Sequence, residues 1–337
     1  MSQSLAIAVD GGNSKTDLAL VRGDGEVLAL VRGPLSSPHH LGLDGALEVL
    51  DRLLDQAARE ARLPPRSPLA EIASLHVAGL DFPAEERRFA EAVTALGWAE
   101  RLIVGNDTFA LLRAGSERGW GVAVVCGAGI NCVGVAPDGR HARFPALGTI
   151  TGDWGGGHDL GLAAIAAAAR SEDGRGPRTS LEQAVPAHYG LATPTEVAEA
   201  LHAGRIATQR ILELAPVVLG AAVEDAVAAA IVERLATEVV TLARVALERL
   251  DLIDEPVEVV LGGGVLTGGD ERLLGSVEAG LRALSPAITM HVTTSPPIVG
   301  SALLALDALG ADQTAKLRTR RELGDARHHE PAEARRG

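Results

Sequence analysis

Aromatic residues and cysteines are scarce in this chain of 337 residues. Aromatics make up 2% of it while hydrophobic residues as a whole reach 47%, so its core must be built from Ala, Val, Leu and Ile. This scarcity disfavours single-stranded nucleic-acid binding, which depends on bases stacked on aromatic side chains. The two cysteines, Cys126 and Cys132, are too few for a disulfide scaffold.

Positive charge is also in short supply. Lys and Arg number 31 against 44 Asp and Glu, which gives a net charge of -13. Binding to nucleic acid or to an anionic membrane is therefore not expected, because both attract Lys/Arg-rich surfaces. No signal-peptide pattern is visible, and charged residues interrupt the Ala-rich stretch 217–247 before it reaches the ~18 apolar residues of a membrane span. We expect a soluble, cytoplasmic protein.

A pattern of strand, glycine loop, strand, Asp-Gly turn and strand occurs twice along the chain. The expected strands are residues 5–9, 17–21 and 26–31, and again 121–126, 131–136 and 140–144. Gly11 and Gly127 are 116 residues apart, and Gly25 and Gly139 are 114 apart. Hairpins with Asp-Gly turns are common, but a loop and a turn that recur in register favour two related α/β lobes.

Between and after these strands, the predicted elements first alternate between strands and helices and are then mostly helices. Apolar periodicity and run length predict strands at 73–77, 102–104 and 257–261, and helices at 43–61, 85–96, 108–113, 195–203, 206–250 and 299–309. We expect a first lobe of residues 1–116, a second of residues 117–298 and a seam near 114–120. The helix over 299–311 is expected to pack back on the first lobe, and the tail 313–337 to be disordered.

The first glycine loop runs from Asp10 to Thr16, between two strands. Its backbone N–H groups are able to form an anion-binding nest, and glycine lets a backbone approach a phosphate closely. The loop is neither a P-loop nor a Rossmann fingerprint, because a strand follows it rather than a helix. The loop Gly127–Asn131 repeats it, and two such loops from two lobes can hold a polyphosphate between them. An ordinary hairpin turn is the alternative for each loop.

Asn106 and Asp107 follow a short predicted strand and precede a helix. A carboxylate there lies at the C-terminal edge of a sheet, where ligands bind in α/β folds. Asn106, Asp107 or Thr108 also fits the role of a helix N-cap, so that alternative stays open.

Two further glycine-rich segments follow. Five glycines within residues 148–157 predict a loop with special backbone angles, in which Asp153 and Trp154 are candidate ligand contacts. A flexible linker is the alternative, although linkers are usually Ser-rich. Gly262–Gly264 follows a hydrophobic strand and suits either packing against a flat ring such as adenine or a tight turn. His39 and His40 are expected in a loop, and a Cys/His metal site is not expected because the chain offers too few ligands at proper spacing.

In this order, the segments resemble those of the sugar kinase/Hsp70/actin superfamily. More narrowly, the chain is similar to the BadF/BadG/BcrA/BcrD-type ATPase family, which includes N-acetylglucosamine kinase, over roughly residues 5–312. The resemblance implies an α/β protein of two ribonuclease-H-like lobes, the actin-like ATPase fold, that close over ATP and Mg²⁺ in a nucleotide cleft.

The resemblance also implies roles for individual residues. Asp10 matches the metal-site carboxylate, and Asp107 matches the catalytic carboxylate that accepts a proton from the attacking sugar hydroxyl. The implied nucleotide-binding residues are Gly11, Gly12, Asn13, Ser14, Lys15, Thr16, Gly127, Ala128, Gly129, Asn131, Gly262, Gly263 and Gly264. The implied substrate-binding residues are Ser37, His39, Asn106, Asp107, Gly148 and Asp153.

The implied activity is ATP-dependent phosphorylation of an amino sugar, at the 6-hydroxyl of N-acetylglucosamine or a relative, by a protein that forms a homodimer. Glucosamine, N-acetylmuramic acid and glucose remain open as substrates. Two alternatives share the fold: an ATPase that activates 2-hydroxyacyl-CoA dehydratases, and a non-catalytic nucleotide or sugar sensor. A Rossmann dehydrogenase is disfavoured by the strand after each glycine loop.

Overall fold

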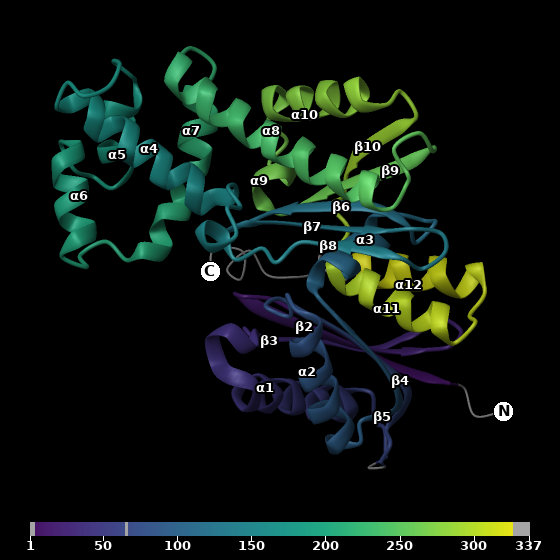
Figure 1. The fold of residues 1–337 in the computed structure, drawn as a ribbon. Helices are drawn as coiled ribbons and strands as arrows, with labels where there is room; N and C mark the ends of the chain where they lie inside the picture. The colour runs from purple at the N-terminus through teal and green to yellow at the C-terminus, as the bar shows by residue number, and fades with distance from the viewer. Residues whose placement is uncertain (1–3, 65–66, 326–337) are drawn as a thin grey trace. The chain divides into compact units, whose positions relative to one another are not determined.

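The computed structural model describes residues 4–64 and 67–325 (Figure 1). Contacts within the chain divide it into two compact units. Unit 1 extends to Trp120 and resumes at Thr294, and unit 2 spans Gly121–Thr293. These limits lie a few residues from the lobe limits expected at 116 and 298.

Unit 1 is built on a mixed five-stranded sheet with the strand order β3-β2-β1-β4-β5. Its strands are β1 (Leu5–Gly11), β2 (Lys15–Arg22), β3 (Val27–Pro34), β4 (Ala70–Val77) and β5 (Ala99–Gly105). The first three pair antiparallel, whereas β1, β4 and β5 run parallel. Strands β1 and β4 are buried on both faces, as expected for central parallel strands covered by helices on each side.

Side-chain alternation along β1 directs its residues into two separate cores. Leu5, Ile7 and Val9 belong to the core beneath α1 (Pro38–Glu60) and α2 (Pro83–Leu96). Ala6 and Ala8 face the opposite core, which is formed with α3 (Asp107–Gly115) and α11 (Pro297–Ala308). Helix α11, from late in the chain, thus packs against the sheet that begins the chain.

A last helix, α12 (Gln313–Asp325), occupies the first part of the tail that was expected to be disordered. The Thr319 hydroxyl donates to the Gly25 carbonyl (3.0 Å), and Glu322 accepts from the Val27 N–H (2.8 Å). The helix buries one face through residues at i, i+4 spacing, namely Ala315, Thr319 and Leu323. The prediction of disorder is therefore wrong for 313–325, and 326–337 lie outside the described residues.

Unit 2 repeats the topology of unit 1. Its sheet has the order β10-β9-β6-β7-β8, in which β6, β7 and β8 pair antiparallel while β6, β9 and β10 run parallel. The strands are β6 (Gly121–Cys126), β7 (Ile130–Val135), β8 (His141–Arg143), β9 (Val257–Gly262) and β10 (Ile288–Val292). Each strand of one sheet has a counterpart in the other, which confirms the two related α/β lobes predicted from the repeat.

Helices fill the rest of unit 2. The helices α8 (Ala226–Arg249), α9 (Gly264–Thr267) and α10 (Glu271–Leu284) contact strands of the sheet. A further helical segment is inserted between β8 and α8 (Figure 1). The inserted elements are η1 (Gly148–Ile150), α4 (Gly156–Glu172), α5 (Leu181–His188), α6 (Pro194–His202), η2 (Thr208–Leu214) and α7 (Ala215–Ala221), where η marks a 3₁₀ helix.

The stretch expected to be helical over 206–250 is helical in the structure, but it is divided between η2, α7 and α8. The helical conformation is interrupted between Ala221 and Ala226. The Asp225 carboxylate caps α8 by accepting from the N–H groups of Val227 (2.8 Å) and Ala228 (3.1 Å). Within the described residues, no single helix is long and apolar enough to cross a membrane. Thr208–Ala221 and Ala226–Arg249 meet that length and composition only as a pair bent by 111°.

Candidate functional site

The first glycine loop joins β1 to β2 in unit 1. Gly11 pairs with Thr16, and the Gly12 N–H donates to the Lys15 carbonyl (2.9 Å), which closes a tight turn. Asn13 and Ser14 are exposed at its tip. The fully buried Thr16 hydroxyl instead donates to the Ser36 Oγ (2.8 Å), so this side chain faces the protein interior. The backbone of the turn, rather than the Thr16 side chain, is the part open to a ligand.

Asp10 lies near the end of β1, in parallel register with His76 of β4. His76 is buried, and its Nδ1 lies 3.1 Å from the Oγ of Ser301 on α11, which donates to the Val9 carbonyl (2.8 Å). Because that hydroxyl proton is already used, His76 Nδ1 carries the proton in this pair. Burial lowers the pKa of His76 to about 3, so a neutral imidazole neighbours Asp10. No sequence signal marks this histidine beyond its place in a predicted strand.

Asn106 is the residue that caps α3. Its Oδ1 accepts from the Thr108 N–H (3.1 Å) and from the Thr108 hydroxyl (2.8 Å), which makes it the N-cap. The N-cap alternative is thus confirmed for Asn106. Asp107, the first residue of the helix, is left partly exposed and is not the cap.

The carboxylate of Asp107 has an unusual proton affinity. Burial and the negative charge of Asp81 raise its pKa to about 6, against backbone hydrogen bonds from Thr108 and Asp107 that lower it. A carboxylate with a pKa just below neutrality is ionised at pH 7.5, yet it binds a proton far better than an ordinary aspartate. This is the property required of a proton acceptor.

Ser37, His39 and Asp81 lie close to Asn106 at this end of unit 1. Asp81 contacts both Asn106 and His39. Its Oδ1 accepts from the Asn106 Nδ2 (2.9 Å). Its Oδ2 lies 4.0 Å from the His39 Nε2. A Cβ on Gly79 would lie 2.9 Å from the Ser37 Oγ and 3.0 Å from the His39 ring, so these two side chains flank the chain just before Asp81. We call Ser37, His39, Asp81, Asn106 and Asp107 the Asp81 cluster.

Two features of the Asp81 cluster were not expected from the sequence. The first is the start of α1 at Pro38, which places His39 and His40 in a helical first turn, so the loop predicted for them is wrong. The second is Asp81, whose only sequence signal was its place just after a predicted strand. Ser37, at the N-cap of α1, is fully buried, and its hydroxyl has no hydrogen-bond partner among the described residues.

The second glycine loop, Gly127–Gly129, is held by the start of α4 in unit 2. The Gly157 N–H donates to the Gly127 carbonyl (2.8 Å), and the His158 N–H donates to the Ala128 carbonyl (3.0 Å). A Cβ on Gly127 or Gly129 would meet nothing within 4 Å. One side of this loop is therefore fixed by the protein and the other is open. Asn131, on β7 just beyond it, is partly exposed.

Two glycines allow this packing. Gly156 has φ +82, and a Cβ there would lie 2.5 Å from the Ala128 carbonyl oxygen. Gly263 has φ +86, and a Cβ there would lie 2.5 Å from the Cys126 backbone. Both conformations are unfavourable for other residues, and both contacts leave no room for a side chain. The structure thus brings the second glycine loop together with Gly262–Gly264 and with the start of α4.

Gly148 and Asp153 share one turn of unit 2. The Gly148 carbonyl accepts from the Asp153 N–H (3.0 Å), and the Asp153 carboxylate accepts from the Thr151 hydroxyl. The neighbouring Trp154 is covered by the Arg234 guanidinium, which lies 3.9 Å from the ring centroid. The six predicted substrate-binding residues therefore divide into four in unit 1 and two in unit 2.

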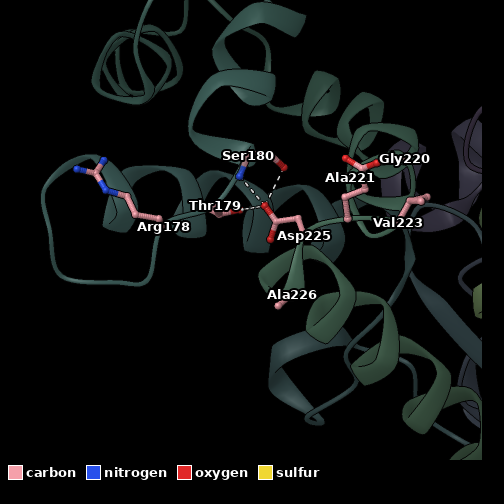
Figure 2. Close-up of a pocket in the computed structure, with 9 residues that line it drawn as sticks. Arg178, Thr179, Ser180, Gly220, Ala221, Val223, Asp225 and Ala226 are labelled. Atoms are coloured by element: carbon pink, nitrogen blue, oxygen red, sulfur yellow. Dashed lines mark hydrogen bonds between the residues drawn. The ribbon is translucent and has the colours of Figure 1, made fainter.

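A separate pocket of about 760 Å³ lies in the helical part of unit 2 (Figure 2). Its lining residues are Arg178, Thr179, Ser180, Gly220, Ala221, Val223, Glu224, Asp225 and Ala226, none of them a predicted site residue. Asp225 accepts from the hydroxyls of Thr179 and Ser180 (2.7 Å each). Burial acts to raise the pKa of Asp225, but these hydrogen bonds outweigh it and hold the pKa well below its usual range. This carboxylate joins α5 to α8.

Cys126 and Cys132 are buried in β6 and β7, which confirms them as strand residues. Burial raises the pKa of the Cys126 thiol to about 12 and that of Cys132 in the same direction. Across residues 4–64 and 67–325, no three side chains of His, Cys, Asp or Glu are grouped so that they could hold a metal ion.

The chain is similar in sequence to a known protein family and to two characterised kinases. A sequence profile of the BadF/BadG/BcrA/BcrD ATPase family matches residues 7–305. The N-acetylmuramic acid/N-acetylglucosamine kinase of Clostridium acetobutylicum is 29% identical over 263 residues, 77% of this chain and 85% of that protein. The N-acetyl-D-glucosamine kinase of Dictyostelium discoideum is 26% identical over 321 residues, 91% of this chain and 99% of that protein.

A solved structure from Chromobacterium violaceum, assigned as an N-acetylglucosamine kinase, superposes with a TM-score of 0.70 at 26% identity. The match covers 90% of this chain and 100% of that one. The predicted fold class, an α/β protein of the actin-like type, is thereby confirmed.

Proposed function

Because the chain belongs to the BadF/BadG/BcrA/BcrD ATPase family, we propose that it is an ATP-dependent kinase that phosphorylates a hydroxyl group of an amino sugar. N-acetylglucosamine is the preferred acceptor, since the relatives compared above are named for that sugar, and its 6-hydroxyl is the proposed site of transfer. The observation that carries the proposal is Asp107, a carboxylate at a sheet edge whose pKa of about 6 suits a proton acceptor.

Both glycine loops are proposed to bind the phosphates of ATP. The turn after Gly11 offers backbone N–H groups and the Lys15 ammonium, and Gly127–Gly129 offers a loop with one open side. Backbone nests of this kind bind anions through local dipoles, so they function in a protein whose net charge is -13. The run Gly262–Gly264 is proposed to pack against the adenosine.

Asp10 is the proposed protein ligand for Mg²⁺. Proteins usually hold this ion through one or two carboxylates, with waters and substrate phosphates completing the octahedron. A single carboxylate at the end of β1, beside the neutral His76, fits that requirement. When bound, Mg²⁺ neutralises negative charge on the phosphates.

The proposed reaction is a direct displacement at phosphorus. The sugar oxygen forms a bond to the γ-phosphorus, the bond from that phosphorus to the β,γ-bridging oxygen breaks, and ADP leaves with that electron pair. The hydroxyl proton passes to the Asp107 carboxylate. Because the transition state is loose, Asp107 mainly orients the hydroxyl and takes its proton late. Ser37, His39 and Asn106, which lie with Asp107 in the Asp81 cluster, are proposed to contact the sugar, and Gly148 and Asp153 stay predicted sugar contacts.

The test is ADP formation by the purified protein with ATP, Mg²⁺ and one sugar at a time. N-acetylglucosamine should stimulate ADP formation most, ahead of glucosamine, N-acetylmuramic acid and glucose. Asp107→Asn should abolish this stimulation and leave nucleotide affinity within about twofold, since the variant keeps both glycine loops. Nucleotide and sugar binding without turnover would instead identify a sensor, and ADP formation indifferent to sugar would identify an ATPase of another kind.

A further inference from the structure

We propose that Asp81, a residue outside the predicted site, is a positioning residue for the transfer reaction that holds Asn106 in place and acts on Asp107 through its negative charge. The inference rests on the proposed function and adds to it a residue that contacts neither reactant. Asp81 follows β4, and its side chain is only 9% exposed.

The geometry orients Asn106 without ambiguity. A carboxylate only accepts hydrogen bonds, so the partner of Asp81 Oδ1 must be the Nδ2 of Asn106 (2.9 Å). The Asn106 Oδ1 is then left facing α3, where it accepts from the Thr108 N–H (3.1 Å). The direction in which α3 starts, and with it the place of Asp107, is thus fixed by a hydrogen bond to Asp81.

Asp81 is itself held rigidly. Its backbone N–H and that of Phe82 both donate to the Glu85 Oε2 (2.9 Å each) at the start of α2, where Glu85 caps the chain from the third helical position. The carboxylate therefore projects from a fixed backbone. A supporting residue fixed in this way keeps a catalytic group close to its productive geometry.

The charges around Asp107 explain why Asp81 matters for its proton. Asp81 is not the only titratable side chain on the elements around the start of α3. Others include Asp10 on β1, His39 on α1, His76 on β4, Glu85 and Glu86 on α2, and Glu100 and Arg101 on β5, while Arg113 of α3 pairs with Asp307 of α11. Buried His76 is neutral at the pH of the reaction. After burial itself, Asp81 is the charged neighbour that raises the pKa of Asp107. Removing that charge should let Asp107 lose its proton at lower pH.

Two substitutions separate the charge from the hydrogen bond. Asp81→Asn removes the charge but keeps a carbonyl oxygen that accepts from Asn106, whereas Asp81→Ala removes both. The pH dependence of kcat should show an acid limb near the pKa of Asp107. In Asp81→Asn this limb should move down by about one pH unit with little change in the plateau. In Asp81→Ala the same shift should accompany a loss of about tenfold or more in plateau kcat, with KM for ATP unchanged.

Asp51→Asn is the matched control, because Asp51 also accepts a side-chain N–H, that of Trp98 (3.0 Å), but lies on α1 outside the cluster. It should leave the acid limb in place. An unmoved acid limb in both Asp81 variants, with equal losses of kcat, would mean that Asp81 is merely structural and would overturn the proposal.

A second readout works without turnover. Carbon-13 NMR of labelled aspartate, with the Asp107 signal assigned through Asp107→Asn, follows the titration of this carboxyl directly. The Asp107 midpoint should fall in Asp81→Asn and stay in Asp51→Asn. If the wild-type protein transfers phosphate to no sugar, the proposed function fails, and an unmoved midpoint in Asp81→Asn still separately refutes the role of Asp81.

Discussion

Replacing Asp107 with asparagine should stabilise the folded protein at neutral pH while abolishing phosphoryl transfer. The asparagine has the same shape and keeps the first position of α3, but it carries no charge. In the native state the ionised carboxylate is disfavoured by burial and by Asp81. In the unfolded chain it is not, so ionisation of this group costs folding free energy.

The size of the effect follows from the pKa of Asp107, which rises from 3.8 to about 6 on folding. At 1.36 kcal/mol per unit, that shift corresponds to about 3 kcal/mol, and solvent screening of this partly exposed group reduces it to about 1–2 kcal/mol. The sign is fixed by linkage. The cost is fully present above the folded pKa of about 6, and it disappears as the pH falls towards 3.8 because the native protein then binds the proton first.

The assay is urea unfolding of the wild type and Asp107→Asn at pH 7.5 and 4.5, followed by intrinsic tryptophan fluorescence, to which Trp98, buried in unit 1, contributes. The variant should be more stable at pH 7.5, and about a third of that gain should remain at pH 4.5. Asp138→Asn is the control, because hydrogen bonds from Arg140 lower the pKa of Asp138 and so predict no gain. Equal stability of Asp107→Asn and the wild type at pH 7.5 would refute this account of Asp107.

Three further substitutions test the glycine loops and the ion pair between α3 and α11. Gly263→Ala should destabilise unit 2 by about 2–4 kcal/mol in thermal unfolding, since its Cβ meets backbone at 2.5 Å, whereas Gly275→Ala in α10, with nothing within 4 Å, should be neutral or slightly stabilising. Lys15→Gln should raise KM for ATP about tenfold in steady-state kinetics, and an unchanged KM would remove Lys15 from the phosphate site. Asp307→Ala should lower the free energy of unfolding by about 2 kcal/mol in urea, because the buried Arg113 guanidinium loses the carboxylate that lies 2.7 Å from it. An unchanged free energy of unfolding would show that this ion pair does not stabilise the fold.

The features that could be predicted from the sequence are those that depend on neighbours in the chain. Asp-Gly turns and glycine loops set the hairpins locally, so the repeat from Gly11 to Gly127 was visible as a spacing before any contact was known. The strand order of the two sheets confirmed it. The polar pair Asn106 and Asp107 between a predicted strand and a predicted helix is likewise recognisable in the sequence. Only the structure shows that Asn106 is the N-cap of α3.

The features that escaped prediction depend on contacts distant in sequence. Helix α12 has few apolar residues, and it is ordered because small side chains such as Thr319 meet the turn at Gly25, 294 positions earlier. Asp81 could not be linked to Asn106 because the two are 25 positions apart, and no spacing rule connects a loop after one strand with a cap after the next. Gly263 is recognisable in the sequence as one of three glycines, but its close approach to the Cys126 backbone at the end of β6 is not.

The measurement that tests the central claim most directly is phosphorus-31 NMR of a reaction containing the protein, ATP, Mg²⁺ and N-acetylglucosamine. The proposed function predicts that the γ-phosphate signal is replaced by a sugar 6-phosphate signal in equal amount to the ADP formed, and that Asp107→Asn gives neither. Formation of inorganic phosphate with no sugar phosphate, across all the amino sugars tried, would contradict it.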